Sequence, residues 1–470
     1  MAQGLHAFSR VERKRIQRKN DRGFCAEASY VLYWMQQAQR VEDNPALAFA
    51  LETAAFLKKP LVVAFSLWGY YPEARWPHFV FMLEGLQELA LKFQSMGIVF
   101  VLRIGEPEDT IYQLAGDAAA LICDVGYLRH QKIWRENLGR RLSCAVFAVE
   151  ASVVVPVAEA LDRRAYAAYV LRPKIMEKMV GFLEPATLLP AHPFKGPPPS
   201  GENPGEGEAL LHRAGVPWSP MPEAWFFTGG EKAALGCLDD FLKQRAGSYV
   251  KDRSLPHRYA VSFLSPFLHF GMISPGLVVR RVQAAELEPE VRTAFLEQFV
   301  VRRELAVNFV HYTPDYDNFG CLPPWARDTL DQHRRDERPY LYTLKALENA
   351  STHDIYWNAA MEEMRLTGYM HNVMRMYWGK KILEWSPSPE EAFERILYLN
   401  NRFFLDGRDP CSYAGCGWIF GLHDRPWPSR QIFGSVRFMA ASGLERKSRI
   451  AEYVRHVDGL PGILNKTSAP

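Results

Sequence analysis

Residues 97–124 read GIVFVLRIGEPEDTIYQLAGDAAALICD, and this stretch decides the fold of the first third of the chain. Its two apolar runs, 97–103 and 119–124, have the length of buried strands, and 107–115 between them has the length of a short helix. A strand, a helix and a second strand in such close succession predict two parallel strands joined by a crossover helix.

The same alternation continues on both sides of this unit. Further strand-like runs lie at 29–35, 60–66 and 145–149, and further helix-like stretches at 45–57, 78–94 and 128–142. Short apolar strands alternating with helices are typical of a doubly wound, Rossmann-like parallel sheet. We therefore predict an α/β domain over 25–155. Because no GxGxxG follows the first strand and no GxxxxGK[ST] occurs, the pattern argues against a dehydrogenase or a P-loop enzyme.

The middle of the chain is predicted to be a linker, and the remainder helical. Pro and Gly are so frequent over 190–222 that we expect no packed element there, and we assign 156–230 to a surface linker between two domains. Strand signals nearly vanish beyond residue 231, so we predict an all-helical domain over 231–460. Its expected helices are 231–245, 275–286, 291–311, 354–366, 369–385 and 389–400.

Composition excludes several classes of protein. The 470 residues are 48% hydrophobic and 23% charged, which is enough for a large core and rules out a disordered chain. The net charge of +3 rules out a wholly basic nucleic-acid binder but allows a local basic groove. Seven cysteines without a CxxC pair predict neither a disulfide framework nor a metal site. With no apolar run near the roughly 18 residues of a membrane span, we expect no membrane insertion.

A basic stretch opens the chain, with seven Lys and Arg residues between Arg10 and Arg22. Such a run is either a solvated surface or an arm for nucleic acid or targeting. The sequence alone leaves both open.

Tryptophans are frequent in the second half of the chain. Trp378 and Trp385 are seven residues apart, so they share one helix face at about 10.5 Å along the axis. Trp357, on the preceding helix, is expected to pack against that face. Three neighbouring indoles suit an electron relay, but a Trp-rich seam between helices has the same spacing.

Three polar or aromatic segments also have two interpretations each. Ser262 and Ser265 suit phosphate binding at a helix N-terminus or ordinary capping. The turn LDGRDPCSY at 405–413 brings carboxylates near an arginine, where they bind something or are simply solvated. Trp418 and Trp427 flank a turn with basic side chains, an arrangement that suits an unstacked base or a core.

Together and in this order, the segments resemble one family, the class II cyclobutane pyrimidine dimer photolyases of the photolyase/cryptochrome superfamily. The matching runs are SFLSPFLHFG (262–271), RRELAVNF (302–309), THDIYWNAA (352–360), RMYWGKKILEW (375–385), LDGRDP (405–410), YAGCGW (413–418) and HDRPW (423–427). The resemblance covers the chain from Tyr33 to about Met439. It implies an α/β antenna domain, a long linker and a helical FAD-binding domain, the same two-domain architecture.

The resemblance implies that the helical domain binds FAD in a U shape. Asn400 would face flavin N5, and Arg375 would pair with Asp406 near the flavin ring; this pair and a neutral amide would tune its redox state. The other residues implied to bind the cofactor are Tyr249, Ser262, Leu264, Ser265, Gln298, Trp357, Asn358 and Asp409.

The implied reaction is light-driven repair of DNA. Reduced, excited FAD passes an electron to a pyrimidine dimer flipped out of double-stranded DNA, the cyclobutane ring opens, and the electron returns. Trp418 and Trp427 would bracket the dimer, Met376 would touch it, and Arg253 would hold it or its phosphates. Catalytic roles are also implied for Gln298 and Asn400, and an inward electron relay for Trp378, Trp357 and Trp385.

The resemblance also implies an optional antenna chromophore, a deazaflavin or a folate, in the α/β domain. A monomer is expected, in the cytoplasm with the nucleoid of a bacterium or in a eukaryotic nucleus.

The sequence departs from the family at several positions. Gln298 stands where the family has a Glu that contacts the dimer, and an amide offers no acidic proton. Asn372, Val307 and Cys411 replace the usual Gly, Asp and Asn, and the segment from Trp418 to Trp427 is one residue short. These changes favour, as an alternative, a cryptochrome-like blue-light photoreceptor with little or no repair activity. A non-flavin nucleotide- or DNA-binding scaffold is the third hypothesis.

Overall fold

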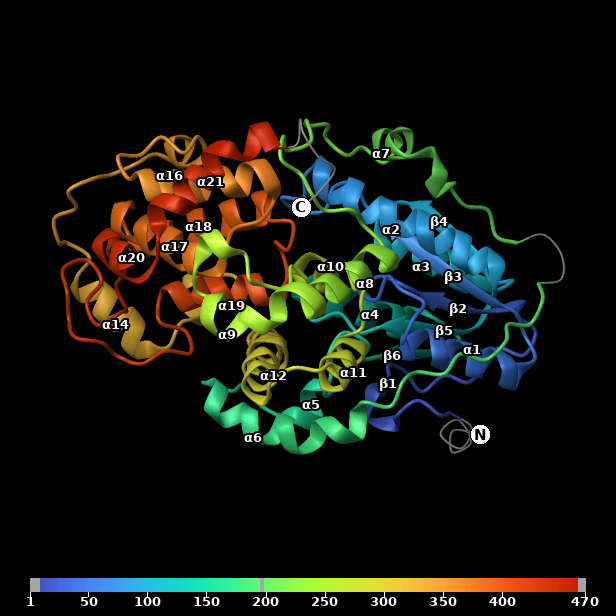
Figure 1. Ribbon diagram of the computed structural model, residues 1–470. Helices are drawn as coiled ribbons and strands as arrows, with labels where there is room; N and C mark the ends of the chain where they lie inside the picture. Colours follow the sequence, from blue (N-terminus) through green and yellow to red (C-terminus); the bar gives the residue numbers. More distant parts are fainter. Residues whose placement is uncertain (1–8, 195–197, 464–470) are drawn as a thin grey trace.

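The computed structural model describes residues 9–194 and 198–463, and it shows a sheet-containing domain beside a helical one (Figure 1). The sheet has six strands in the order β1-β6-β5-β2-β3-β4. All neighbours except β1 and β6 pair in parallel, which confirms the predicted doubly wound sheet. The parallel strands are β2 (Tyr30–Trp34), β3 (Leu61–Leu67), β4 (Val99–Ile104), β5 (Ala118–Asp124) and β6 (Ala145–Val149).

Helices cover both faces of the sheet because successive strand side chains point to opposite faces. Val31 and Tyr33 pack in one apolar cluster with α1 (Pro45–Leu57) and α2 (Trp76–Ser95). Leu32 and Trp34 pack in another, with α3 (Pro107–Leu114) and α4 (Arg129–Arg141). Strands with apolar side chains on both faces are what a continuous apolar run predicts.

The basic N-terminal stretch is part of the fold in its described portion. After a 3₁₀ turn at Arg13–Arg15, β1 (Ile16–Arg18) pairs antiparallel with β6 at the edge of the sheet. Arg15 is buried, and its guanidinium donates to the backbone carbonyls of Glu150, Val153, Val154 and Phe182 at 2.7–3.1 Å. The backbone of this portion is therefore not a free arm, while Arg10, Arg13, Lys14 and Arg22 remain exposed, as the solvated-surface interpretation expects, and Arg15 is the exception.

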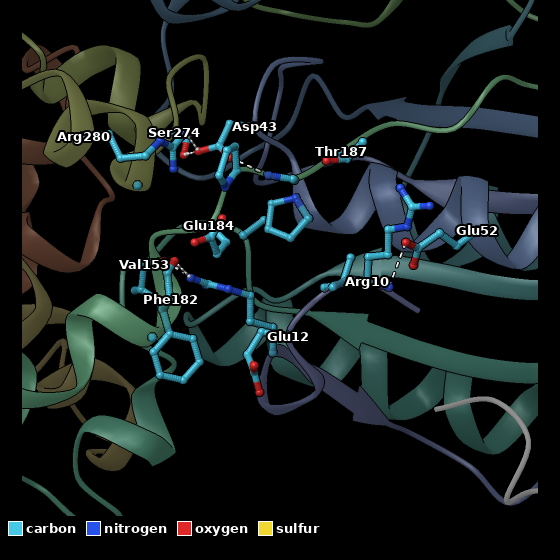
Figure 2. Close-up of a pocket in the computed structure, with 18 residues that line it drawn as sticks. Arg10, Glu12, Asp43, Glu52, Val153, Phe182, Glu184, Thr187, Ser274 and Arg280 are labelled. Carbon is cyan, nitrogen blue, oxygen red and sulfur yellow. Dashed lines mark hydrogen bonds and ion pairs between the residues drawn. The ribbon is translucent and has the colours of Figure 1, made fainter. Parts of the chain in front are cut away.

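A polar cavity of about 170 Å³ lies between this stretch and the helical domain (Figure 2). On one side the Arg10 N–H donates to Glu52 at 2.9 Å. On the other, Asp43 accepts from Ser274 Oγ at 2.5 Å and pairs with Arg280 at 3.0 Å. Because Ser274 and Arg280 belong to the helical domain, Asp43 ties the two domains together.

The region 156–230 contains helices as well as extended chain. They are α5 (Val157–Ala160), α6 (Ala168–Lys178) and α7 (Glu208–Arg213). Leu210 and Leu211 of α7 are fully buried against the α/β core, so the expectation of no packed element over 190–222 is wrong. Two adjacent leucines are enough to hold one short helix in place despite the surrounding Pro and Gly.

The second domain is helical, as predicted. Its helices are α8 (Glu231–Asp240), α9 (Tyr249–Asp252), α10 (Ser265–His269), α11 (Pro275–Ala284), α12 (Pro289–Leu296), α13 (Arg303–Tyr312), α14 (Pro324–Gln332), α15 (Leu344–Glu348), α16 (Ile355–Thr367), α17 (Asn372–Trp385), α18 (Pro389–Phe403), α19 (Pro410–Ile419), α20 (Ala441–Lys447) and α21 (Ile450–Ile463). The helix expected over 291–311 is interrupted by a π-helical turn at Glu297–Arg302. Within the described ranges, no helix is long and apolar enough to cross a membrane.

Candidate functional site

Two adjoining cavities lie in the helical domain, an inner one of about 650 Å³ and an outer one of about 540 Å³. Each exceeds the volume of several water molecules, so each can hold part of a large ligand. The wall that lines both cavities consists of Tyr249, Ser262, Leu264, Ser265, Gln298, Asn372, Met376, Cys411 and Gly415. These residues come from α9, α10, the π-helical turn, α17 and α19 and from the chain just before α10.

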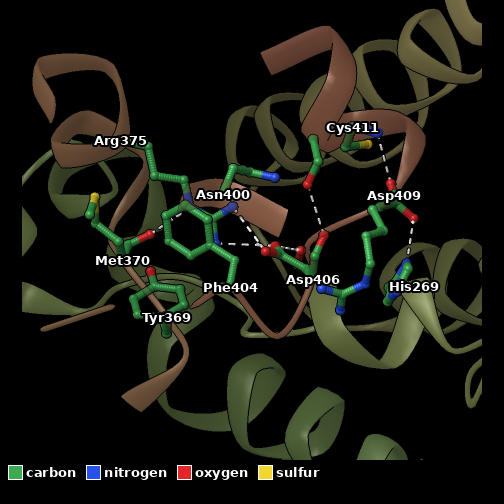
Figure 3. Close-up of polar contacts among 12 residues, drawn as sticks. His269, Tyr369, Met370, Arg375, Asn400, Phe404, Asp406, Asp409 and Cys411 are labelled. Atoms are coloured by element: carbon green, nitrogen blue, oxygen red, sulfur yellow. Dashed lines mark hydrogen bonds and ion pairs between the residues drawn. The ribbon is translucent and has the colours of Figure 1, made fainter. Parts of the chain in front are cut away.

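A bidentate ion pair lies at the inner cavity (Figure 3). The Arg375 guanidinium contacts the two Asp406 carboxylate oxygens at 3.0 and 3.2 Å, and its Nε donates to the Met370 carbonyl at 2.9 Å. The same guanidinium lies 3.8 Å from the centre of the Phe404 ring. Ser265 Oγ also donates to Asp406. The pair is thus held by Met370, Phe404 and Ser265 on its protein side, and such contacts offset part of its desolvation.

Asn400 and Asp409 occupy different positions around this pair. Asn400 lines the inner cavity, and its Nδ2 donates to Asn401 Oδ1 at 3.0 Å. Asp409 lines the outer cavity and caps α19 by accepting from Cys411 N at 2.8 Å. Burial acts to raise the pKa of Asp409, but the hydrogen bond and charge of His269 and the backbone N–H lower it below its usual value. Asp409 therefore remains a carboxylate at neutral pH.

The two serines do not cap a helix. Leu264 occupies the position before α10, without a side-chain cap, and Ser265 Oγ binds Asp406 instead. Ordinary capping is therefore the wrong interpretation of this pair. Both serines line both cavities, which leaves their predicted role toward a phosphate as a proposal.

Gln298 faces the cavities, and Glu297 is engaged elsewhere. Gln298 is on the π-helical turn and lines both cavities. Glu297 accepts two hydrogen bonds from Arg172 at 2.8 Å and one from Arg302 at 3.1 Å. The hydrogen bond from Arg172 is the main cause that lowers the pKa of Glu297. The neighbouring acid consequently does not replace the carboxyl that the resemblance expects at Gln298.

The outer cavity has aromatic and basic walls. Trp418 lines it, with the Arg302 guanidinium 5.4 Å from its ring centre. Trp427 is 37% exposed and lies outside the cavity lining, with Arg437 at 5.0 Å from its ring. Arg437 lines the outer cavity, so it stands between Trp427 and that cavity.

Of the other two residues predicted to contact the dimer, Met376 belongs to the shared wall and Arg253 lines the inner cavity. The Arg253 guanidinium lies 5.5 Å from the centre of the Tyr249 ring.

The three predicted relay tryptophans are neighbours and are all buried. Trp378 lines the inner cavity. Trp357 Nε1 donates to the Trp378 carbonyl at 3.0 Å, and the Trp357 and Trp385 rings lie 5.6 Å apart. The expected contact of Trp357 with this helix face is therefore present, whereas the electron relay itself stays a prediction.

Two residues predicted to bind the cofactor lie away from both cavities. Asn358 binds Thr352 through its Oδ1 at 2.7 Å and its Nδ2 at 2.8 Å, so its amide holds the turn before α16. Trp357 is behind Trp378. The motif did not separate these positions from the cavity wall, because Trp357 and Asn358 are adjacent in the run THDIYWNAA (352–360) and sequence alone does not show which of them reaches a cavity.

Some residues of the outer cavity were not singled out from the sequence as part of a site. They are Phe295, Phe299, Arg302, Arg303 and Arg437, whereas His423 belongs to the turn between Trp418 and Trp427 that was singled out. The signal for Arg302 and Arg303 was present in RRELAVNF, where adjacent arginines on a helix precede an apolar run.

Comparisons with known proteins agree with this architecture. The sequence profile described as DNA photolyase matches residues 31–192. The chain is 42% identical to a deoxyribodipyrimidine photo-lyase of Methanothermobacter thermautotrophicus, over 96% of this chain and 99% of that protein. It is 40% identical to the one of Oryza sativa, over 93% of this chain and 89% of that one.

Solved structures show the same fold. A class III photolyase from Agrobacterium tumefaciens superposes with a TM-score of 0.71 at 20% identity, over 92% of this chain and 86% of that one. A Synechocystis cryptochrome gives the same TM-score at 17% identity, over 94% and 92%. With near-complete coverage at 42% identity, the chain belongs to the deoxyribodipyrimidine photo-lyase family, within the photolyase/cryptochrome superfamily.

Proposed function

We propose that the protein is a class II photolyase that splits cyclobutane pyrimidine dimers in double-stranded DNA under light. The observation that carries the proposal is the pair of adjoining cavities with a shared wall, the inner one lined by the Arg375–Asp406 pair and the Asn400 amide, the outer one by Trp418, Arg302 and Arg437. Such a pair suits one cofactor and one substrate held in contact. Family membership supports light-dependent DNA repair, and the motifs support the dimer as the lesion.

The inner cavity fits FAD. Besides the Arg375–Asp406 pair and the Asn400 amide, it is lined by Trp378, whose buried Nε1 has no partner among the described residues. An unpaired buried donor facing a cavity is expected where a ligand supplies the acceptor. Tyr249, Ser262, Leu264 and Ser265 would hold the phosphate side, with Asn400 near N5 and the ion pair beside the ring.

When bound, reduced FAD would supply the light-excited electron that opens the cyclobutane ring and would receive it back, so no net oxidation occurs. The chain's own residues arrange this chemistry. Arg375 offers a fixed positive charge, and Asn400 offers a neutral amide that donates or accepts without carrying charge. Trp378 closes the inner cavity, and Trp357 and Trp385 extend from it as the proposed path that restores the reduced cofactor.

The outer cavity would take the dimer after it leaves the base stack. Trp418 offers a ring face, and Met376, in the shared wall, would touch both ligands. Gln298 would donate a hydrogen bond from its amide to a dimer carbonyl. Arg302 and Arg437 would bind phosphates or the lesion from the outer cavity, and Arg253 would do so from the rim of the inner one. A poorly stacked lesion lowers the cost of extrusion.

An antenna chromophore would bind where the α/β domain meets the helical one. A cavity there is lined at the carboxyl ends of β2 and β3 by Gln36, Phe65 and Trp68, with His269 and Arg408 opposite. Parallel sheets bind ligands at this edge, and aromatic and amide side chains suit a flat ring. Extraction and absorption spectra of the purified protein would tell a deazaflavin from a folate. The monomeric state and the compartment beside DNA remain part of this proposal.

One observation favours a second function, a blue-light photoreceptor on the same scaffold. Gln298 faces the cavities without an acidic proton, and Glu297 is occupied by two arginines. A photoreceptor needs the cofactor and the tryptophans but not a substrate carboxyl.

A repair assay distinguishes the two functions. The reduced protein is mixed with an oligonucleotide duplex carrying one thymine dimer, illuminated with blue light, and dimer loss is followed by chromatography against a dark control. Light-dependent loss establishes the photolyase. Bound flavin that photoreduces without any dimer loss overturns it in favour of the photoreceptor.

A further inference from the structure

Two neighbouring tyrosines form an exposed aromatic pair outside the cavities. Tyr166 and Tyr169, at the start of α6, are 63% and 60% exposed. Their rings lie edge to face at 5.5 Å, and Tyr169 Oη donates to Tyr166 Oη at 2.5 Å. Large exposed aromatics with little rotamer freedom are typical of contact surfaces, because they bury area at low entropy cost.

The backbone beneath this pair is fixed from the helical domain. Asn308, which is buried on α13, accepts from Ala165 N at 2.7 Å and donates to the Arg163 carbonyl at 3.0 Å. Arg164 Nη2 donates to the Cys321 carbonyl at 2.9 Å. Tyrosines presented on such a fixed backbone are preorganised for a partner.

The pair is joined directly to the wall of the outer cavity. His423 Nδ1 donates to the Tyr166 carbonyl at 3.0 Å, and the His423 ring lies 5.8 Å from the Trp418 ring. Both His423 and Trp418 line the outer cavity. Burial lowers the pKa of His423 to about 4, so this histidine is neutral and its Nδ1–H is the donor. The tyrosine pair therefore continues the rim of the outer cavity onto the surface.

The surrounding charge suits a polyanion. The run 162–178 contains five basic residues, Arg163, Arg164, Arg172, Lys174 and Lys178, against the two acids Asp162 and Glu177. Arg172 pairs with Glu297 and Arg164 binds the Cys321 carbonyl, whereas Arg163, Lys174 and Lys178 are exposed and available to phosphates. Aromatic rings stack on bases of any sequence, and neighbouring cations contact phosphates. The chemistry that fits this surface is a nucleotide strand rather than an apolar peptide.

We propose that Tyr166 and Tyr169 bind the nucleotides that flank the extruded dimer on the damaged strand. This inference rests on the proposed function, since it requires a dimer in the outer cavity. The tyrosines stack against a base or sugar next to the lesion, and they hold that strand where the dimer can enter the cavity. They are substrate-positioning residues, distant from the reacting atoms.

The test compares Tyr166→Ala/Tyr169→Ala with Tyr166→Phe/Tyr169→Phe and with a control, Tyr112→Ala, which removes a partly exposed tyrosine of α3. Dissociation constants are measured for a duplex with one thymine dimer, and repair is measured at saturating duplex. In a second arm, 2-aminopurine replaces the base beside the dimer or a base on the opposite strand, and its fluorescence reports stacking.

We expect the alanine variant to bind the damaged duplex roughly 10-fold more weakly, as the loss of one stacked base predicts. Its flavin content and its repair rate at saturation stay those of the parent, and the phenylalanine and Tyr112→Ala variants bind as the parent does. The flanking probe on the damaged strand is quenched by the parent and not by the alanine variant.

Unchanged affinity in the alanine variant, or quenching only on the opposite strand, overturns this inference while leaving repair intact. A parent protein that neither binds nor repairs the dimer refutes the proposed function instead.

Discussion

The indole of Trp357 donates its N–H to the backbone carbonyl of Trp378 at 3.0 Å, which joins two helices directly beside the inner cavity. Trp378 faces that cavity, and Trp385 contacts Trp357 on the far side. The three tryptophans are thus linked in the order Trp378, Trp357, Trp385, the first step through a backbone carbonyl and the second through the two rings. Beyond Trp385, the rings of Tyr342 and His353 each lie 5.3 Å away.

Replacing Trp378 with Phe should block blue-light photoreduction of bound flavin and leave most of the FAD bound, since it removes at most one hydrogen bond to the cofactor, worth about 1 kcal/mol. Trp378 Nε1 has no partner among the described residues, so the substitution breaks no internal hydrogen bond of that nitrogen. Flavin absorbance under illumination is the measurement, with Trp134→Phe in the α/β domain as the control. Equal photoreduction in the Trp378 variant and the parent would refute the relay.

Replacing Gln298 with Glu should raise the repair yield per photon, because a carboxylic acid binds and protonates a developing negative charge better than an amide. About 1 kcal/mol of stronger hydrogen bonding corresponds to roughly fivefold. Quantum yields of dimer splitting are compared between variant and parent. The matched control is Glu297→Gln, which should leave the yield unchanged because Glu297 faces Arg172 and Arg302. No gain from Gln298→Glu would mean that the amide already suits its task.

Replacing Asp406 with Asn should destabilise the inner cavity and lower FAD retention. It leaves the Arg375 charge without its partner, and breaking a buried pair from one side costs about 3 kcal/mol. Denaturant unfolding and the flavin-to-protein ratio measure the two effects. The control is Asp331→Asn, which removes a surface partner of Arg334 and should cost less than about 1 kcal/mol. Equal losses in the two variants would show that the Asp406 pair has no special role.

The contribution of Glu363 to the stability of the protein should fall between pH 5 and pH 8. Burial raises the pKa of Glu363 to about 7, although Tyr259 and Tyr453 each donate to it at 2.6 Å. Because its folded pKa is above the unfolded one, its stabilising contribution is complete below about pH 4 and is lost as the pH rises through 7. In Glu363→Gln this part of the pH dependence, on the order of 2–3 kcal/mol, should disappear from unfolding free energies measured across that range. A variant with the parent's pH profile would contradict the assignment.

Replacing Arg15 with Met should destabilise the protein by about 3 kcal/mol or more, since four backbone carbonyls lose a charged donor. The exposed neighbour Arg13 gives a matched control, because Arg13→Met removes the same charge and should have little effect. Thermal unfolding of both variants is the measurement. Equal shifts would indicate that the net charge of the stretch matters, and not the burial of Arg15.

Much of the fold follows from local sequence patterns. The five parallel strands are continuous apolar runs. Such runs can be recognised in the sequence without knowledge of the tertiary contacts. The edge strand β1 was missed because Ile16–Arg18 is short and mostly polar, and only pairing with β6 makes it a strand. The burial of Arg15 was equally hidden, since a sequence shows charge but not the carbonyls that surround it.

The candidate site was predictable in its residue types and less so in its geometry. The motifs contained the Arg375–Asp406 pair, which the structure brings into contact. They also contained Asn358, whose amide holds a turn instead. The π-helical turn that positions Gln298 has backbone hydrogen bonds that span one residue more than those of an α-helix. This difference is too small for the apolar periodicity to reveal.

The shared wall has a consequence for how this protein can change over evolution or in the laboratory. Met376, Gln298 and Cys411 border both cavities, so a substitution at any of them alters the surroundings of both ligands at once. Phe299, Arg302 and Arg437 border the outer cavity alone. A search for variants that accept a different lesion should therefore randomise these outer positions first and leave the residues of the shared wall unchanged.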